Sequence, residues 1–321
     1  MIEVHSAGIS HITDLGRFGH THVGVQTNGA ADRTSARLAN ILVGNDDSFP
    51  VIESLAFFPL RLRTSTSLLI SVTGAAKEVY IDGVLLPTEV PIRAWPGAVI
   101  TVPPAPRGLH SYLGIHGRMG ADEFLGSVAF DPLIQRGSRL FDGMDIPMTG
   151  HGIDYRLPFP YYPLNFHRPP LLGQITLGVL PGPEYDEFPD STSRLDDLTF
   201  TVGSQSDHVG LRLDGASFIR TTDTEILSRG VPVGAVEAPP NGSLIVLLRG
   251  RPLTAGYPVP FVVGRGWHDL LGQLRPGDAV TLQLSTAARS ASLAQAELDL
   301  IERVRTLCRN AFHATGVFPA A

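Results

Sequence analysis

A short segment near the N-terminus returns in the second half of the chain. HVGVQTNGA at 22–30 is matched by HVGLRLDGA at 208–216, with the His, the Val, both Gly and the final Ala in register. In the same order, and at an offset of about 180 residues, FPVIES parallels VPVGAVEAP, SLLISVTG parallels SLIVLLRG, and WPGAVITV parallels RPGDAVTL. Such a repeat predicts a duplicated domain in which the two copies superpose and 22–30 overlies 208–216.

Length and composition agree with two domains. The chain has 321 residues, of which 43% are hydrophobic and 17% charged, so each half can bury a core of its own. The stretch before residue 172 is rich in proline, which suits an extended connection. We therefore expect a first domain at 1–160, a proline-rich connection at 161–172, and a second domain at 173–321 that includes a C-terminal helix.

Most segments predict strands. LLISVTG, EVYIDGVLL, AVITVPP, QITLGVL and AVTLQLS are short, rich in β-branched residues and bounded by Gly, Pro or polar turn residues, so the fold class is mainly β with a few helices. One short helix is expected to begin at Asp32 as its N-cap and to end at Gly44. Apolar residues at helical spacing predict a terminal helix over 290–312.

Charge and motif content exclude several classes of function. A net charge of −6 and a pI near 6.0 argue against nucleic acid or an anionic membrane as a partner. The N-terminus lacks a signal-peptide pattern, which predicts a cytoplasmic protein. Lys77, the only lysine, lies in neither a P-loop motif nor the Met-Lys-Met of biotin carriers, so neither a P-loop ATPase nor a covalently bound cofactor is expected.

Local motifs leave their chemistry open. Asp14 and Arg17 in DLGRFG could close a turn as an ion pair or form part of a site. No third and fourth ligand accompanies His20 and His22, so no metal site is expected. The loop RPLTAGYP at 251–258 presents a guanidinium, a hydroxyl and a phenol, and it suits either a ligand-binding loop or a plain turn.

Taken together, several motifs resemble one family. DLGRFGHTHVGVQTNGAADRTSARLANILVGND, VIES, FLGS, SDHVGLRLDG, ILSRGVPVGAVEAPPNG, LTAGYP and LGQLRPGD are similar to segments of the biotin-dependent carboxyltransferase family. This family includes the C subunit of 5-oxoprolinase, allophanate hydrolase subunit 2, the KipA-type antagonists and part of urea carboxylase. The chain departs from its usual pattern at His208 in SDHVG, where Arg is usual, and at Glu237 in GAVE, where Gln is usual.

The resemblance implies two tandem cyclophilin-like β-barrel domains and a hetero-oligomer. Its members pair with a smaller KipI-like protein (the B subunit of 5-oxoprolinase or subunit 1 of allophanate hydrolase), and in the 5-oxoprolinase complex also with a third subunit. The complex uses ATP, which we expect to bind at a partner subunit. In the urea carboxylase relative the same module receives carboxybiotin as a substrate.

The leading interpretation is a subunit of an ATP-dependent amide-processing complex resembling the C subunit of 5-oxoprolinase, a hydrolase that opens 5-oxoproline to glutamate. One alternative is an allophanate hydrolase subunit 2 or a urea-carboxylase-type carboxyltransferase component, and another is a non-catalytic KipA-type regulatory subunit. The residues expected to act in catalysis are Glu237, Thr254 and Tyr257. The residues expected to bind a small carboxylated amide are Asp14, Arg17, Asn28, Asp32, His208, Arg212 and Arg251.

Overall fold

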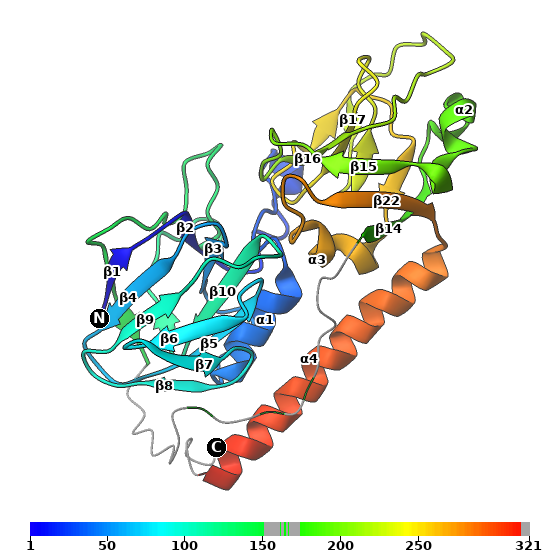
Figure 1. The fold of residues 1–321 in the computed structure, drawn as a ribbon. Coiled ribbons are helices and arrows are strands. Elements are labelled where there is room, and N and C mark those ends of the chain that lie inside the picture. The colour runs from blue at the N-terminus through cyan, green and yellow to red at the C-terminus, as the bar shows by residue number, and fades with distance from the viewer. Residues whose placement is uncertain (151–160, 162–163, 165, 167–173, 316–321) are drawn as a thin grey trace. The chain divides into compact units, whose positions relative to one another are not determined.

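The computed structural model describes residues 1–150, 161, 164, 166 and 174–315 (Figure 1). Contacts within the chain define two compact units. The first consists of Met1–Arg17, Asn28–Pro169 and Leu298–Ala321, and the second of Phe18–Thr27 and Pro170–Glu297. The expected connection at 161–172 lies for the most part outside the described residues.

The first unit is built from two sheets around one core. Its six-stranded sheet has the order β12-β1-β4-β9-β6-β7, and its five-stranded sheet the order β2-β3-β10-β5-β8, beside a small β11-β13 pair. Alternating residues explain the arrangement, because Leu60 and Leu62 of β4 face the core while Arg61 and Arg63 face outward. The strands are β1 (Ile2–Ser6), β2 (Ser10–Thr13), β3 (Val51–Leu55), β4 (Leu60–Thr64), β5 (Leu68–Gly74), β6 (Glu78–Ile81), β7 (Val84–Pro87), β8 (Ile92–Ala94), β9 (Val99–Val102), β10 (His110–Ile115), β11 (Arg118–Met119), β12 (Asp145–Ile146) and β13 (Met148–Thr149).

Helix α1 (Arg33–Leu42) covers the outer face of the five-stranded sheet, against β5 and β10 (Figure 1). Strand β5 is therefore buried on both faces, and its small polar side chains bond to the helix: Ser71 Oγ donates to the Ala39 carbonyl at 2.6 Å. Gly114 permits this approach, since a Cβ there would lie 2.2 Å from the same carbonyl oxygen. The prediction of Asp32 as N-cap is confirmed, because its carboxylate accepts from the Ser35 amide at 2.8 Å.

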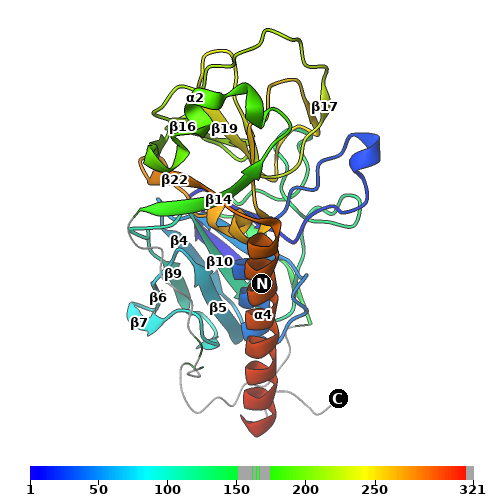
Figure 2. The same cartoon turned by 90° about the vertical axis from the view of Figure 1, so that its right-hand side faces the viewer.

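The second unit contains a closed barrel with the strand order β14-β21-β18-β19-β16-β15-β22. Strands β14 and β22 pair in parallel, side by side in Figure 2. Strands β17 and β20 form a separate two-stranded sheet. The elements are β14 (Ile175–Pro181), β15 (Thr199–Val202), β16 (Gly210–Asp214), β17 (Arg229–Gly230), β18 (Ala235–Glu237), β19 (Leu244–Leu247), β20 (Thr254–Ala255), β21 (Phe261–Val263), β22 (Ala279–Leu284), α2 (Pro189–Thr192), α3 (His268–Leu271) and the 3-10 turns η1 (Thr21–Val23), η2 (Tyr185–Glu187), η3 (Leu195–Asp197) and η4 (Arg265–Trp267).

The terminal helix α4 (Ala287–Thr315) confirms the helix expected at 290–312. The buried apolar residues of its C-terminal part, however, do not pack in the second unit. Ile301, Val304, Cys308 and Phe312 share a buried cluster with Leu38 and its neighbours of α1, so the helix from Leu298 onward belongs to the first unit. Helical spacing reveals that a stripe is buried but not what covers it. No helix in the described ranges is long and apolar enough to cross a membrane.

The mainly β class is confirmed, but the strand-by-strand match between the repeats is wrong. Segment 22–30 begins in the turn η1 and contains no strand, whereas 208–216 contains β16. Likewise β3 and β5 are separated by β10, whereas β18 and β19, their expected counterparts, are direct neighbours. Short runs of β-branched residues between glycines are common to many buried strands. Similar runs therefore do not determine which strands pair with one another.

Candidate functional site

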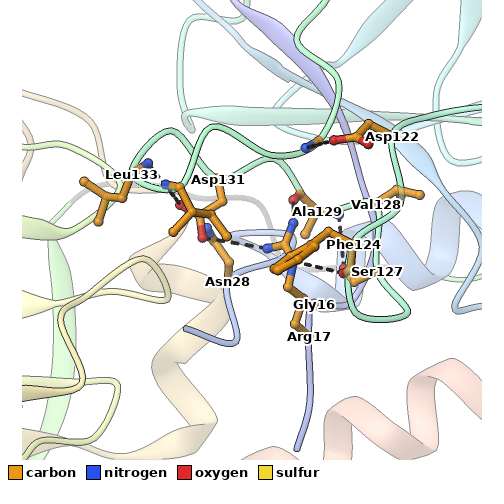
Figure 3. Close-up of polar contacts among 12 residues, drawn as sticks. Gly16, Arg17, Asn28, Asp122, Phe124, Ser127, Val128, Ala129, Asp131 and Leu133 are labelled. Atoms are coloured by element: carbon orange, nitrogen blue, oxygen red, sulfur yellow. Dashed lines mark hydrogen bonds and ion pairs between the residues drawn. The ribbon is translucent and has the colours of Figure 1, made fainter. Parts of the chain in front are cut away.

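Arg17 is fully buried in the first unit and holds the loop at 124–131 (Figure 3). Its Nε donates to the Phe124 carbonyl at 3.3 Å and its Nη2 donates to the Ala129 carbonyl. Its Nη1 lies 3.7 Å from Asp131 Oδ2. Burial lowers the pKa of Arg17, although the charges of Asp131 and Asp14 oppose that change. Two of its three nitrogens thus donate to one loop of its own unit, while Nη1 has the ion pair but no hydrogen bond among the described residues.

Asp14 is attached to the same loop. Its carboxylate accepts hydrogen bonds from the Gly16 amide at 2.8 Å, from Ser127 Oγ at 2.6 Å and from the Val128 amide at 2.9 Å. An ion pair between Asp14 and Arg17, one of the two alternatives for this motif, is therefore not the main contact of either side chain. Each residue reaches a loop more than a hundred positions away, which local sequence could not reveal.

Asn28 does not bind the loop at 124–131 through its side chain. It has a positive φ of 52° and is buried, and its Nδ2 has no hydrogen-bond partner among the residues that the structure describes. Gly29 follows with φ 89°, and a Cβ there would meet the backbone of Gly16 at 2.6 Å. Asn28 is thus the amide donor that remains available to a ligand in this segment. Its role in substrate binding stays a prediction.

A row of polar side chains crosses the outer face of the five-stranded sheet. His11 of β2 and Tyr112 of β10 stand directly opposite Glu53 of β3. Glu53 accepts from the Ala31 amide at 2.9 Å, and His11 Nε2 lies 3.1 Å from its other oxygen. Burial acts to raise the pKa of Glu53, but the charge of His110 and the contacts with His11 and Tyr112 outweigh it and bring the pKa to about 2.

The entry to α1 is tied to this row. The Asp32 amide donates to the Tyr112 hydroxyl oxygen at 2.8 Å, and Asp32 is 2% exposed. Burial, followed by the charge of Glu53, raises the pKa of Tyr112 well above its usual range. Asp32 therefore stabilises the helix and its attachment to the sheet, and nothing in its contacts requires a substrate. Local sequence patterns do not reveal this network, because its members come from four separate segments.

A second row crosses the outer face of the barrel in the second unit. Arg212 of β16 stands opposite Ile245 of β19, and Ile245 stands opposite Glu237 of β18. Their chain neighbours Leu211, Leu213 and Val236 fill the barrel core, so these three side chains point outward. Directly opposed residues share a face, and two strand spacings separate Arg212 from Glu237, or about 10 Å. Ile245, which no sequence motif indicated, lies between them and is the apolar residue of the row.

Glu237 is the buried member of that row. It is 4% exposed, and its Oε1 has no hydrogen-bond partner in the described part of the chain. Burial raises its pKa. At the other end of the row, Arg212 is exposed, and its backbone amide is held by Ser206 Oγ at 3.0 Å. A buried acid with a raised pKa and an accessible guanidinium therefore share one surface.

The loop at 251–258 borders this surface. Ala238, which follows Glu237, donates its amide to the Pro258 carbonyl at 2.9 Å, and Ala255 packs with Ala235 and Ile245. Arg251 Nε donates to the Val231 carbonyl at 2.9 Å, whereas its Nη1 is buried and lacks a partner among the described residues. Burial, with a smaller contribution from Arg249, lowers the pKa of Arg251.

The other predicted residues of this unit are exposed. Thr254 lies in β20 and Tyr257 at the end of the loop, where 45% of its surface is exposed. His208 is exposed and packs against Gly250, at which a Cβ would lie 2.5 Å from the imidazole Cδ2. Glu184 was missed: it binds Arg229 of β17 and accepts from the Val259 amide at 2.9 Å, so it ties β17 to the residue that follows the loop.

Among the residues that the structure places, no three His, Cys, Asp or Glu side chains gather as metal ligands would. The candidate chemistry therefore rests on the two outer-face rows. We name them by their carboxylates: the Glu53 row (His11, Glu53, Tyr112) and the Glu237 row (Arg212, Ile245, Glu237).

Comparison with known proteins agrees with this architecture. The chain is 32% identical over 274 residues to the C subunit of 5-oxoprolinase from Escherichia coli, covering 80% of this chain and 83% of that protein. It is 24% identical over 306 residues to urea amidolyase of Saccharomyces cerevisiae, covering 88% of this chain but only 16% of that protein. The crystal structure of the K. lactis urea amidolyase superposes with a TM-score of 0.84 at 22% identity, over 94% of this chain and 20% of that one.

The sequence also matches the family described as "Carboxyltransferase domain, subdomain A and B" over residues 23–284, which is most of the chain. The span includes Glu53, Arg212, Glu237 and the loop at 251–258. With the resemblance to the C subunit of 5-oxoprolinase, this match shows the family: the chain belongs to the carboxyltransferase domain, subdomain A and B, family.

Proposed function

We propose that this chain is the subunit of an ATP-dependent amide-processing complex that binds 5-oxoproline, and that the Glu237 row is its substrate surface. The similarity to the C subunit of a 5-oxoprolinase supports the choice of complex. The observation that carries the proposal is the placement of Arg212 and Glu237 on one face, with Ile245 between them. In a small cyclic amide that carries a carboxylate, the carboxylate suits Arg212 and the amide group suits Glu237.

Arg212 would bind the substrate carboxylate. A guanidinium recognises a carboxylate through paired N–H donors, and this side chain is exposed on the strand rather than used inside its own unit. Ile245 would support the apolar ring carbons. Arg251, whose Nη1 has no partner among the described residues, supplies a second donor at the border of the surface.

Glu237 would meet the lactam group as a neutral acid. Burial raises its pKa, which favours the protonated form. In that form the carboxyl would donate a hydrogen bond to the lactam oxygen while its second oxygen accepts one from the ring nitrogen. This arrangement explains why the resemblance gives Gln at the same position: a carboxylic acid and a primary amide have the same shape, and each offers a donor and an acceptor.

In the reaction, water adds its oxygen to the lactam carbon, the ring C–N bond breaks, and the nitrogen takes up a proton to give glutamate. A hydrogen bond from Glu237 to the carbonyl oxygen stabilises the negative charge that develops there. Thr254 and Tyr257 lie on the neighbouring loop, where their hydroxyls can orient water. ATP hydrolysis, which we place at a smaller KipI-like partner protein, supplies the driving force.

The test is glutamate formation from 5-oxoproline and ATP by the chain co-purified with its partner subunits. Glu237→Gln should remain active, whereas Glu237→Ala should lose about 100-fold in kcat/KM, the usual value of one hydrogen-bond donor to a developing oxyanion. Glu225→Gln, at an exposed acid of the same unit, is the matched control and should match the unaltered complex. An inactive Glu237→Gln would show that Glu237 must transfer its proton. Full activity of Glu237→Ala would exclude the site.

A second candidate is transfer of a carboxyl group from carboxybiotin to an amide nitrogen. The family description and the similarity to a urea amidolyase favour it. The same row would then hold a urea-type amide, with Glu237 again as the neutral partner of the amide. Consumption of carboxybiotin with urea, but no glutamate from 5-oxoproline, would select this function. If the complex supports neither reaction, the non-catalytic regulatory interpretation is favoured.

A further inference from the structure

The second unit contains a cavity that lies outside the Glu237 row. It measures about 550 Å³, within the range of small-molecule sites. Strands β14 and β22, the turn η4 and the start of α4 surround it, and its lining residues are Thr176, Gly178, Trp267, Gln283, Leu284, Ser285, Thr286 and Arg289. None of these residues has a role in the function proposed above.

Glycines shape one wall of this cavity. Trp267 packs directly on Gly178 of β14, where a Cβ would lie 2.3 Å from the indole Cη2. Gly264 also admits the indole, since its Cβ would lie 3.0 Å from Cζ3. Gly266 allows η4 to approach α4, because a Cβ there would meet the Leu293 side chain at 2.5 Å. The indole is thus held against the sheet and presents a flat apolar wall.

Other residues of the lining offer donors for an anion. The guanidinium of Arg289 is exposed and pairs with no acceptor in the described ranges. Ser285 Oγ is buried and has no hydrogen-bond partner among the described residues. The first turn of α4 adds the positive end of a long helix, with Thr286 Oγ1 already accepting from the Arg289 amide at 3.1 Å. An exposed guanidinium and a residue with a buried, unpartnered hydroxyl therefore belong to the same lining as the indole.

We propose that this cavity binds a small carboxylate attached to a flat ring. The ring lies on Trp267 and the carboxylate pairs with the Arg289 guanidinium at the start of α4. Gln283 offers an amide at the rim for a further polar substituent. The site is separate from the Glu237 row and does not depend on the function proposed for it.

Tryptophan fluorescence tests the proposal on the full chain. The protein has two tryptophans, Trp95 and Trp267, so Trp95→Phe leaves Trp267 as the single reporter. Titration with benzoate should give a saturable change in emission with a dissociation constant on the order of 1 mM, reasonable for nine non-hydrogen atoms. Benzamide, which has the same shape without the charge, should bind about tenfold more weakly.

Substitution separates binding from a general effect on the fluorophore. Arg289→Gln should weaken benzoate binding by about tenfold without a change in Tm. Arg303→Gln, at another exposed arginine of α4, is the matched control and should bind as the parent does. A linear, unsaturable response to benzoate would overturn the proposal. Equal affinities of the Arg289→Gln and Arg303→Gln variants, or of benzoate and benzamide, would overturn it as well.

Discussion

Glu53 and Glu237 occupy similar places in the two units, but their pKa values are shifted in opposite directions. Each is 4% exposed and projects from the outer face of a sheet, in a row of directly opposed residues. Glu53 has donors at both oxygens and a pKa of about 2. Glu237 has no partner at Oε1 among the described residues, and burial raises its pKa.

The difference lies in what covers each carboxylate. The residues before α1 lie over Glu53 and bring the Ala31 amide to it, while β2 and β10 contribute His11 and Tyr112. Glu237 has Ile245 as its neighbour in the row and a loop that ends at Pro258 beside it. Burial with donors stabilises the anion, whereas burial without them raises the pKa and leaves the acid available to a ligand.

The largest expected effect is the loss of stability caused by a substitution at Glu53. Glu53→Gln should lower the free energy of unfolding by about 3 kcal/mol, because it removes the charge from a buried network and leaves the surrounding donors poorly matched. Glu237→Gln should change it by less than about 1 kcal/mol. Urea unfolding followed by circular dichroism measures both. A smaller loss in Glu53→Gln than in Glu237→Gln would reverse the comparison.

The two carboxylates should also give opposite dependences on pH. The folded pKa of Glu53 lies below its ordinary value of 4.5, so its stabilisation is present above that value and is lost as the pH falls toward about 2. The folded pKa of Glu237 is raised, so its contribution is present in acid and is lost as the pH rises through that pKa. As the pH falls below 4.5, the urea midpoint of Glu53→Gln should decrease less steeply than that of the parent protein. As the pH rises through the raised pKa of Glu237, the urea midpoint of the parent should decrease, and that of Glu237→Gln should not. Parallel profiles for both variants and the parent would contradict this.

A smaller effect is expected at the helix that covers the Glu53 row. Asp32→Ala should cost about 1 kcal/mol, the value of a lost N-cap, and should leave ligand binding at the Glu237 row unchanged. Thermal unfolding and 5-oxoproline titration of the same sample measure the two quantities. A stable Asp32→Ala variant that has lost binding would make Asp32 a ligand-binding residue rather than a cap.

The smallest effect on stability is expected at the exposed end of the Glu237 row. Arg212→Gln should change the free energy of unfolding by no more than about 0.5 kcal/mol, as is usual for surface positions. It should nevertheless raise KM for 5-oxoproline, because the carboxylate loses its guanidinium partner. An unchanged KM in the assembled complex would remove Arg212 from the substrate surface.

Sequence alone predicted the features that depend on neighbouring residues. The Asp32 cap, the helix after it, the terminal helix and the β-rich segments all follow from local patterns. The Glu237 row could not be predicted, because Arg212, Ile245 and Glu237 meet only through the register of three strands. For the same reason Arg17 was placed with Asp14, whereas its guanidinium extends to the loop at 124–131.

Carboxyl NMR tests the central claim most directly. Protein labelled with ¹³C at the glutamate side-chain carboxyl would be titrated with acid and base, and the two signals assigned from the Glu53→Gln and Glu237→Gln variants. The account predicts one signal that titrates near a pKa of about 2, from Glu53, and one that titrates above the ordinary value of 4.5, from Glu237. If both signals titrate near the ordinary value, or if the Glu237 signal titrates below that of Glu53, the distinction between a structural anion and an available acid is contradicted.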